Sequence, residues 1–126
     1  MKINYKMALT LLAGIAFGGL AVQALHAQAK PKIYIVNDVE VTDPVGFKAH
    51  AGHMDPLIEK FDGTFLARGG KARALNGAGP HRMVIVVFEN IEKEQAWEND
   101  PEVKELIATR GTYANFRSIV IEGVAN

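Results

Sequence analysis

The stretch Met83-Val84-Ile85-Val86-Val87-Phe88 decides the fold of this chain. Successive side chains of a strand point to opposite faces, so six apolar residues in a row make both faces apolar. The rest of the chain offers only two helical regions, which cover one face of a sheet. We therefore expect the other face to be covered by a second copy, in a homodimer that packs sheet against sheet.

The segments around this stretch alternate between strand and helix patterns. Apolar residues recur at spacings of four and three from Phe47 to Phe61, which is typical of an amphipathic helix. Val103, Leu106 and Ile107 form a second such stripe, with Arg110 on the same face. The order βαββαβ predicts a ferredoxin-like fold of the α+β class, with a four-stranded antiparallel sheet in the order 4-1-3-2. The expected strands are residues 33–41, 64–68 with pairing resumed through 71–75, 81–89 and 117–123.

Several residues mark where these elements begin and end. Asp43 before Pro44, Asn90, and Asp100 before Pro101 are typical helix caps. Pro56 should kink or restart the first helix, with Asp55 capping the second piece. Gly69-Gly70 predicts a bulge or bend in the second strand.

Residues 1–29 have the pattern of a signal peptide. Lys2 and Lys6 precede an uncharged apolar run, and Ala27-Gln28-Ala29 suits cleavage after Ala29. We expect residues 30–126 to be a single domain, periplasmic or secreted, with no membrane association after cleavage. An uncleaved membrane anchor is the alternative.

Composition excludes several classes of function. Loss of Lys2 and Lys6 would leave 12 Lys and Arg against 14 Asp and Glu, which does not suit a nucleic-acid partner. The sequence contains no cysteine, so thiol catalysis and Cys-ligated metals are excluded. It lacks the nucleotide-binding, hydrolase and zinc-protease motifs as well. We expect no cofactor.

Four segments resemble the family called domain of unknown function 1330. They span nearly all of the chain after the leader: Tyr34-Ile35-Val36 leading to Val41-Thr42-Asp43-Pro44, Gly63-Thr64-Phe65-Leu66-Ala67-Arg68-Gly69-Gly70, Trp97-Glu98-Asn99-Asp100-Pro101-Glu102-Val103, and Val120-Ile121-Glu122-Gly123-Val124. The resemblance implies a dimeric α+β barrel, a superfamily that includes small monooxygenases, isomerases and haem-handling proteins. The leader and Val103, where an aromatic residue such as Tyr is expected, depart from the family pattern.

Basic residues without nearby acids suggest an anion site. Between Gly63 and Phe88 the sequence has no acid, and Arg68 shares strand parity with Leu66, which should turn it toward a covered face. Arg68 could hold a carboxylate beside the backbone of Gly69 and Gly70. Arg82 is a further candidate ligand. The alternative is that these charges protect an edge strand or pair with acids of a second copy.

His50 is the candidate for proton transfer. His50 and His53 lie three residues apart on the first expected helix. Two histidines alone are too few ligands for a metal site. His50 should instead line the space beneath that helix, where its imidazole could titrate near neutral pH. Asn37 and Asp38, polar residues on a central strand, compete for this role. Trp97 is expected to be a core residue.

Three hypotheses follow from these observations. The first is an exported homodimer that binds a small, partly apolar organic acid between helices and sheet. The second is a cofactor-free oxygenase or isomerase that moves a proton through His50 or Asp38. The third is a structural or stress-associated interaction protein, which a fully packed interior would favour.

Overall fold

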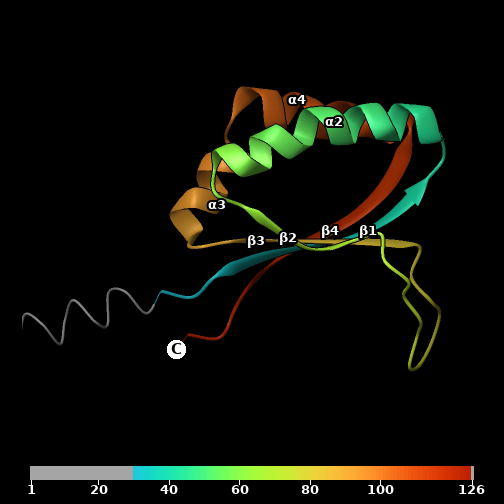
Figure 1. The fold of residues 1–126 in the computed structure, drawn as a ribbon, viewed down its shortest axis with the longest axis horizontal. Coiled ribbons are helices and arrows are strands. Elements are labelled where there is room, and N and C mark those ends of the chain that lie inside the picture. Colours follow the sequence, from blue (N-terminus) through green and yellow to red (C-terminus); the bar gives the residue numbers. More distant parts are fainter. Residues whose placement is uncertain (1–29, 126) are drawn as a thin grey trace, which may run out of the picture. The chain divides into compact units, whose positions relative to one another are not determined.

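The stretch around Met83 forms an inner strand of a four-stranded sheet in the computed structural model, which describes residues 30–125 (Figure 1). All neighbouring strands are antiparallel, in the order β2-β3-β1-β4. This order is the expected 4-1-3-2, so the ferredoxin-like α+β fold is confirmed. The strands are β1 (Ile33–Val41), β2 (Thr64–Arg68), β3 (Arg82–Phe88) and β4 (Ala114–Glu122). The expected leader, residues 1–29, lies outside the described residues.

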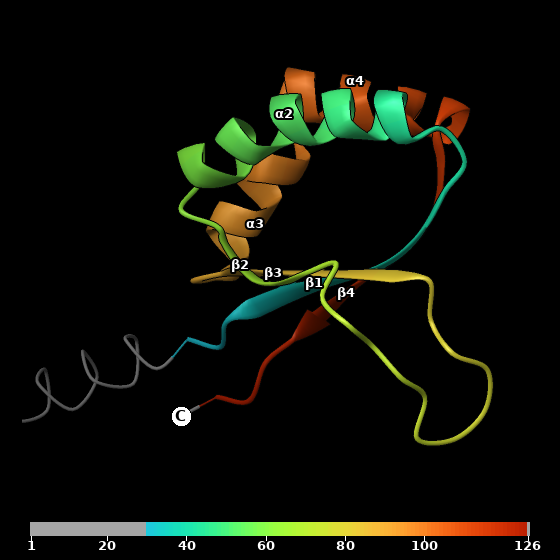
Figure 2. The ribbon, with the colours of Figure 1, turned by 45° about the vertical axis from the view of Figure 1, so that its right-hand side comes forward.

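The three α-helices within residues 30–125 pack on one side of this sheet (Figures 1 and 2). They are α2 (Pro44–Lys60), α3 (Ile91–Glu98) and α4 (Pro101–Thr109), and α4 is followed by a short 3-10 turn, η1 (Arg110–Thr112). The carboxylate of Asp43 accepts from the Val45 N–H, Asn90 caps α3, and Asp100 caps α4 through two backbone N–H groups. The three predicted caps are therefore confirmed, and each satisfies N–H groups that lack a helical partner.

Two local predictions are wrong. Helix α2 does not restart at Pro56 but continues as one helix, so Asp55 caps no second piece and instead forms an ion pair with Arg68. The second strand ends at Arg68, and no strand resumes through residues 71–75. Instead, residues 69–81 form an exposed loop that extends on the side of the sheet away from the helices (Figures 1 and 2).

The inner face of the sheet carries the buried core. Ile35 on β1 and Val86 and Phe88 on β3 pack against Leu57 and Ile58 of α2. Trp97 and Val103 complete this cluster from α3 and α4, so the prediction that Trp97 is a core residue is confirmed. Burying each such side chain contributes about 1.5–3 kcal/mol.

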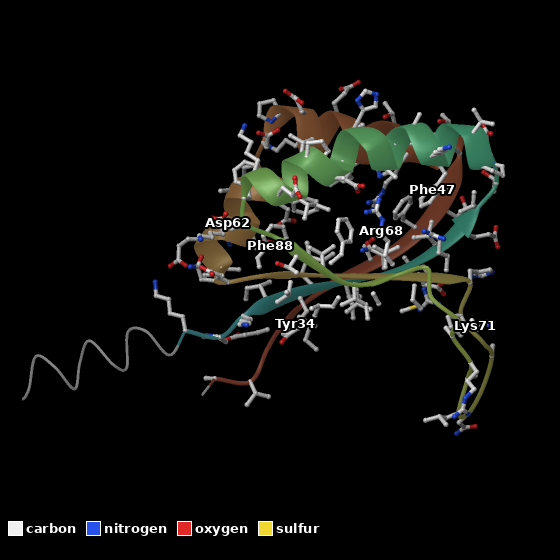
Figure 3. All side chains as sticks on the ribbon, viewed as in Figure 1. Tyr34, Phe47, Asp62, Arg68, Lys71 and Phe88 are labelled. Atoms are coloured by element: carbon white, nitrogen blue, oxygen red, sulfur yellow. The ribbon has the colours of Figure 1, made fainter. Side chains whose placement is uncertain are left out.

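The outer face of the sheet is apolar and has no covering layer among the described residues. Tyr34 lies on this side, away from the helices, whereas Phe88 lies between the layers (Figure 3). Strand parity assigns further apolar residues to the outer face, and Ile119 and Ile121 are 58% and 52% exposed there. The remaining outer-face apolar residues are Val36, Ala67, Met83, Ile85 and Val87.

Candidate functional site

A pocket of about 80 Å³ lies between the inner face of the sheet and helix α2. Its walls come from all four strands, from α2, and from Trp97 and Arg110. The strand side chains reach it because alternate residues of β1, β3 and β4 point to the helix side. The space is large enough for several water molecules or a small organic ligand.

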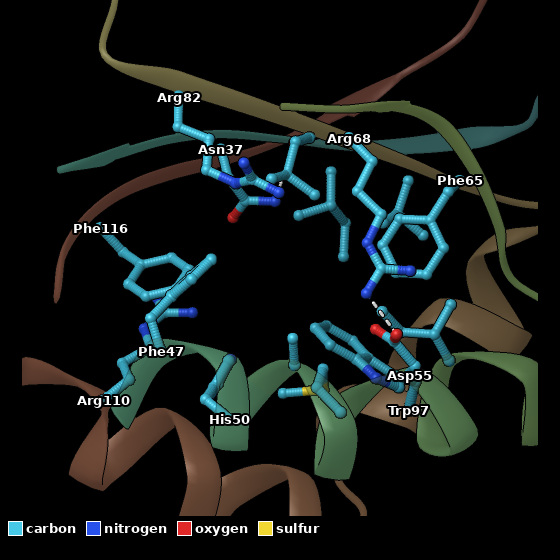
Figure 4. A pocket seen from close by; sticks show the side chains of 16 residues that line it. Asn37, Phe47, His50, Asp55, Phe65, Arg68, Arg82, Trp97, Arg110 and Phe116 are labelled. Carbon is cyan, nitrogen blue, oxygen red and sulfur yellow. Dashed lines mark hydrogen bonds and ion pairs between the residues drawn. The ribbon is translucent and has the colours of Figure 1, made fainter. Parts of the chain in front are cut away.

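The pocket has two chemically different halves (Figure 4). One half is polar and cationic and includes Arg82 and Arg110 beside the rings of Phe47 and Phe116. The other half holds apolar side chains such as Phe65 and Trp97 beside the ion pair of Arg68 with Asp55, so it carries no unpaired charge (Figure 4).

Arg82 and Arg110 are held by aromatic rings rather than by acids. The Arg82 guanidinium lies 5.5 Å from the centroid of Phe47, and that of Arg110 lies 4.1 Å from the centroid of Phe116. The two rings are themselves 6.2 Å apart. Within residues 30–125, neither arginine forms an ion pair with a carboxylate. Burial lowers the pKa of Arg110, and the Nε of Arg82 is buried without a hydrogen-bond partner in this part of the chain.

Arg68, the residue favoured by the sequence, also lines the pocket, but it has a partner. Its guanidinium forms an ion pair with Asp55 of α2 and lies 4.5 Å from the centroid of Phe65. Both charged side chains remain partly exposed, so the pair lies at the solvent side of the pocket.

The reason given for the orientation of Arg68 was wrong, although the expected face was right. Leu66, which shares its parity, is 56% exposed. The register of β2 against β3 shifts between Phe65 and Ala67. This bulge brings Arg68 to the same face as Phe65, because one extra residue in a strand reverses the parity of those that follow.

His50 faces the pocket from α2 and is hydrogen-bonded to Tyr113. The imidazole is 8% exposed, and its Nδ1 lies 2.6 Å from the Tyr113 hydroxyl. Burial, and secondarily the nearby charge of Arg110, lowers the pKa of His50 below its ordinary value of 6.5. Burial raises the pKa of Tyr113. At neutral pH the pair is therefore an uncharged imidazole beside an uncharged phenol.

Asn37 lies on the sheet side of the pocket, where its amide is largely occupied. Its Nδ2 donates to the Val84 carbonyl at 3.0 Å, and its Oδ1 accepts from the Ser118 hydroxyl at 2.5 Å. The side chain thus connects β1 to both neighbouring strands. One of its two amide hydrogens is left for a ligand.

Three of the predicted residues lie outside this pocket. Asp38 points to the outer face, where its carboxylate accepts from the His81 N–H at 2.8 Å. Gly70 has nothing near the position of a Cβ. Gly69 has a φ of 70°, and a Cβ there would overlap the Arg82 guanidinium. Gly69 therefore makes room for Arg82. The structure brings together Asn37, His50, Arg68 and Arg82.

Three contributing residues were missed from the sequence. Arg110 and Tyr113 follow α4, and Tyr113 is hydrogen-bonded to His50 of the first helix. Phe116 is a half-buried residue near the start of β4. An arginine at the end of the apolar stripe of α4 was the available signal, because a charge in such a stripe is unusual.

Residues 30–125 contain neither a group of metal-binding side chains nor a membrane-crossing helix. No group of three or more His, Cys, Asp or Glu side chains there could hold a metal ion. Within the same range, no helix combines the length and apolar character that crossing a membrane requires.

Comparison with solved structures shows the same fold in proteins of low sequence identity. The RPA0582 protein of unknown function from Rhodopseudomonas palustris is 16% identical, with a TM-score of 0.62, and the match covers 77% of this chain and 85% of that chain. SnoaB, a cofactor-independent oxygenase from Streptomyces nogalater, is 11% identical, with a TM-score of 0.54, over 76% of this chain and 96% of that chain.

Sequence comparison places the chain in a family. No curated protein matches it. The family model described as Domain of unknown function (DUF1330) matches residues 32–124, so the chain belongs to the DUF1330 family.

Proposed function

We propose that this protein is an exported homodimer that binds a small, partly apolar organic acid in the pocket beneath α2. One observation carries the proposal: the cationic half of the pocket contains guanidinium groups that no acid of residues 30–125 neutralises, and the opposite half holds apolar side chains beside an ion pair that is already balanced. Partly buried charges are stabilised by opposite charge and hydrogen bonds, which a carboxylate supplies to a guanidinium in a planar, bidentate arrangement.

This assignment changes the residues that hold the acid. Arg68 is already neutralised by Asp55, so it contributes less than the sequence suggested. Arg82 and Arg110 are the better anion ligands, with Asn37 able to donate one hydrogen bond. The apolar half would hold the hydrocarbon part of the ligand, as in most small-molecule sites.

Trp97 provides a direct binding assay. It is the single tryptophan of the sequence and it lines the pocket, so a ligand there should change its fluorescence. Benzoate, a monocarboxylate with one ring, is a suitable probe at low salt. We expect saturable quenching that weakens at least tenfold in Arg82→Gln and is unchanged in Arg73→Gln, a matched control on the exposed loop. Equal affinity in both variants would reject the assignment.

The homodimer is supported by the exposed apolar outer face. Leaving Val36, Ile85, Val87, Ile119 and Ile121 in water would forfeit several kcal/mol, on the order of the whole stability of a small domain. A second copy packed against this face would recover that energy. Sedimentation equilibrium at micromolar concentration should give twice the chain mass, and a monomer would contradict the proposal.

Export is supported by the signal-peptide pattern of residues 1–29. Cleavage after Ala29 would give a mature chain that begins at Lys30. Intact mass measurement of the protein from the exported fraction tests this proposal. A mass that includes Met1 to Ala29, or retention in the cytoplasm, would contradict it.

Cofactor-free proton transfer is a second candidate function, favoured by the hydrogen bond between His50 and Tyr113. A neutral imidazole beside bound acid could accept a carbon-bound proton, and Tyr113 would orient the ring. Asp38 is not part of this candidate because it lies on the other face of the sheet. Phenylpyruvate in D₂O tests the idea by NMR: the protein should accelerate exchange of its methylene protons, and His50→Gln should not. Equal rates for both proteins would reject it.

A further inference from the structure

We propose that the acid bound in this pocket is a dianion, which presents two negative charges to Arg82 and Arg110 together. This inference rests on the proposed binding function and names the class of ligand. It follows from the charges that surround the pocket and from which of them have partners.

The side chains that line the pocket carry a net charge of about +2 at neutral pH. Four charged side chains line it: Asp55, Arg68, Arg82 and Arg110. Asp55 and Arg68 form an ion pair and cancel each other. The lowered pKa of His50 leaves its imidazole uncharged at neutral pH, so it adds nothing. Arg82 and Arg110 remain, and a monoanion would neutralise only one of them.

The two arginines are arranged to act on one ligand. Their guanidinium groups lie against Phe47 and Phe116, and these two rings are in contact at a centroid distance of 6.2 Å. Both groups reach the polar half of the same pocket, although Arg82 comes from β3 and Arg110 follows α4 (Figure 4). A guanidinium beside a ring can still donate from its N–H edge. One N–H of Arg110 donates to the Ser118 hydroxyl at 3.4 Å, and its other N–H groups remain for a ligand.

The Nε of Arg82 supplies a second, independent observation. This atom is buried, and it finds no acceptor among residues 30–125. A buried donor without an acceptor is costly, so a turn of the Arg82 side chain that brings this N–H to a ligand oxygen in the pocket would remove the cost. Gly69 supports the arrangement, because any side chain at this position would overlap the guanidinium.

Two ligand chemistries carry the required charge: a dicarboxylate and a phosphate monoester, which is mostly doubly ionised at pH 8. The apolar half limits the remainder of either ligand to a compact hydrocarbon group, such as one ring. Isophthalate and phenyl phosphate are the corresponding probes, and benzoate is the matched monoanion.

The test is a comparison of three affinities at pH 8, measured by Trp97 fluorescence on the mature protein. We expect isophthalate, phenyl phosphate or both to bind at least about tenfold more tightly than benzoate, because a further charge-assisted hydrogen bond is formed. If only one dianion shows the advantage, it identifies the chemistry. Arg82→Gln and Arg110→Gln should each reduce the advantage to about twofold or less, whereas Arg73→Gln should preserve it.

The outcomes separate this inference from the function on which it rests. If benzoate binds and neither dianion exceeds it by more than twofold, the acid-binding function stands and the dianion inference is overturned. If no probe binds, both fall. The main comparison uses the unaltered protein, so a variant that fails to fold does not remove the test.

Discussion

Glu94→Gln is predicted to stabilise this protein at pH 8 and to remove the part of the pH dependence of its stability that comes from Glu94. Glu94 lies on α3, one turn before Trp97, and is 1% exposed. Its Oε2 has no hydrogen-bond partner within residues 30–125. Burial, and secondarily a hydrogen bond and charge repulsion from Glu98, raises the pKa of Glu94 from 4.5 to about 7.

The sign and size of the effect follow from this shift. In the unfolded chain Glu94 ionises near its ordinary pKa, whereas in the folded protein it keeps its proton until about pH 7. The stabilisation is therefore complete below pH 4.5 and is lost as the pH rises to about 7. A shift of about 2.5 units corresponds to about 3 kcal/mol, which Glu94 shares with Glu98 because the two groups interact.

The assay is urea denaturation at one protein concentration and at pH 4.5, 6 and 8. The unaltered protein should lose about 3 kcal/mol across this range from Glu94, and Glu94→Gln should lose much less. Glu98→Gln is the matched control, and it should keep most of the slope because burial is the larger cause. The same slope in the unaltered protein and in Glu94→Gln would refute the reasoning.

Three further predictions concern the site, the interface and a helix cap. Gly69→Ala should weaken benzoate binding at least several-fold by displacing Arg82, whereas Gly70→Ala, with free space around it, should not; equal titrations would refute this role. Ile121→Glu on the outer face should convert the proposed homodimer to monomers in sedimentation, and an unchanged dimer mass would place the interface elsewhere. Asp100→Ala should lower the free energy of unfolding by about 1 kcal/mol, because it removes the cap of α4; thermal denaturation with no change in stability would contradict it.

The fold could be predicted because its signals are local and repeated. The strand pattern of β1, the unbroken apolar run of β3, the apolar stripes of the helices, and the caps at Asp43, Asn90 and Asp100 all agree with one topology. Pro56 was misread because tertiary packing holds α2 together where the local rule predicts a break. The strand expected at residues 71–75 is absent, because local strand propensity is weak evidence when the segment has no neighbouring strand to pair with.

The site was harder to predict because it depends on tertiary geometry. Arg82 and Asn37 reach the pocket by simple strand parity, but Arg68 does so only through the bulge after Phe65. The ion pair between Arg68 and Asp55 joins two elements whose distance the sequence does not give. Likewise, Tyr113 meets His50 across 63 residues. The sequence therefore does not show which arginine is paired with an acid, and the folded structure does.

The arrangement along α2 explains how a small domain can keep a polar pocket without losing its core. The later part of the helix, with Leu57 and Ile58, packs into the apolar cluster around Phe88. The earlier part of the helix carries His50, which lines the pocket from the helix side, and Asn37 of β1 lines it from the sheet side. Most of the burial energy therefore comes from one end of the layer, and the polar groups at the other end are held by hydrogen bonds and ring contacts. Substitutions beside Asn37 should consequently affect ligand affinity more than folding, and substitutions beside Phe88 should do the reverse.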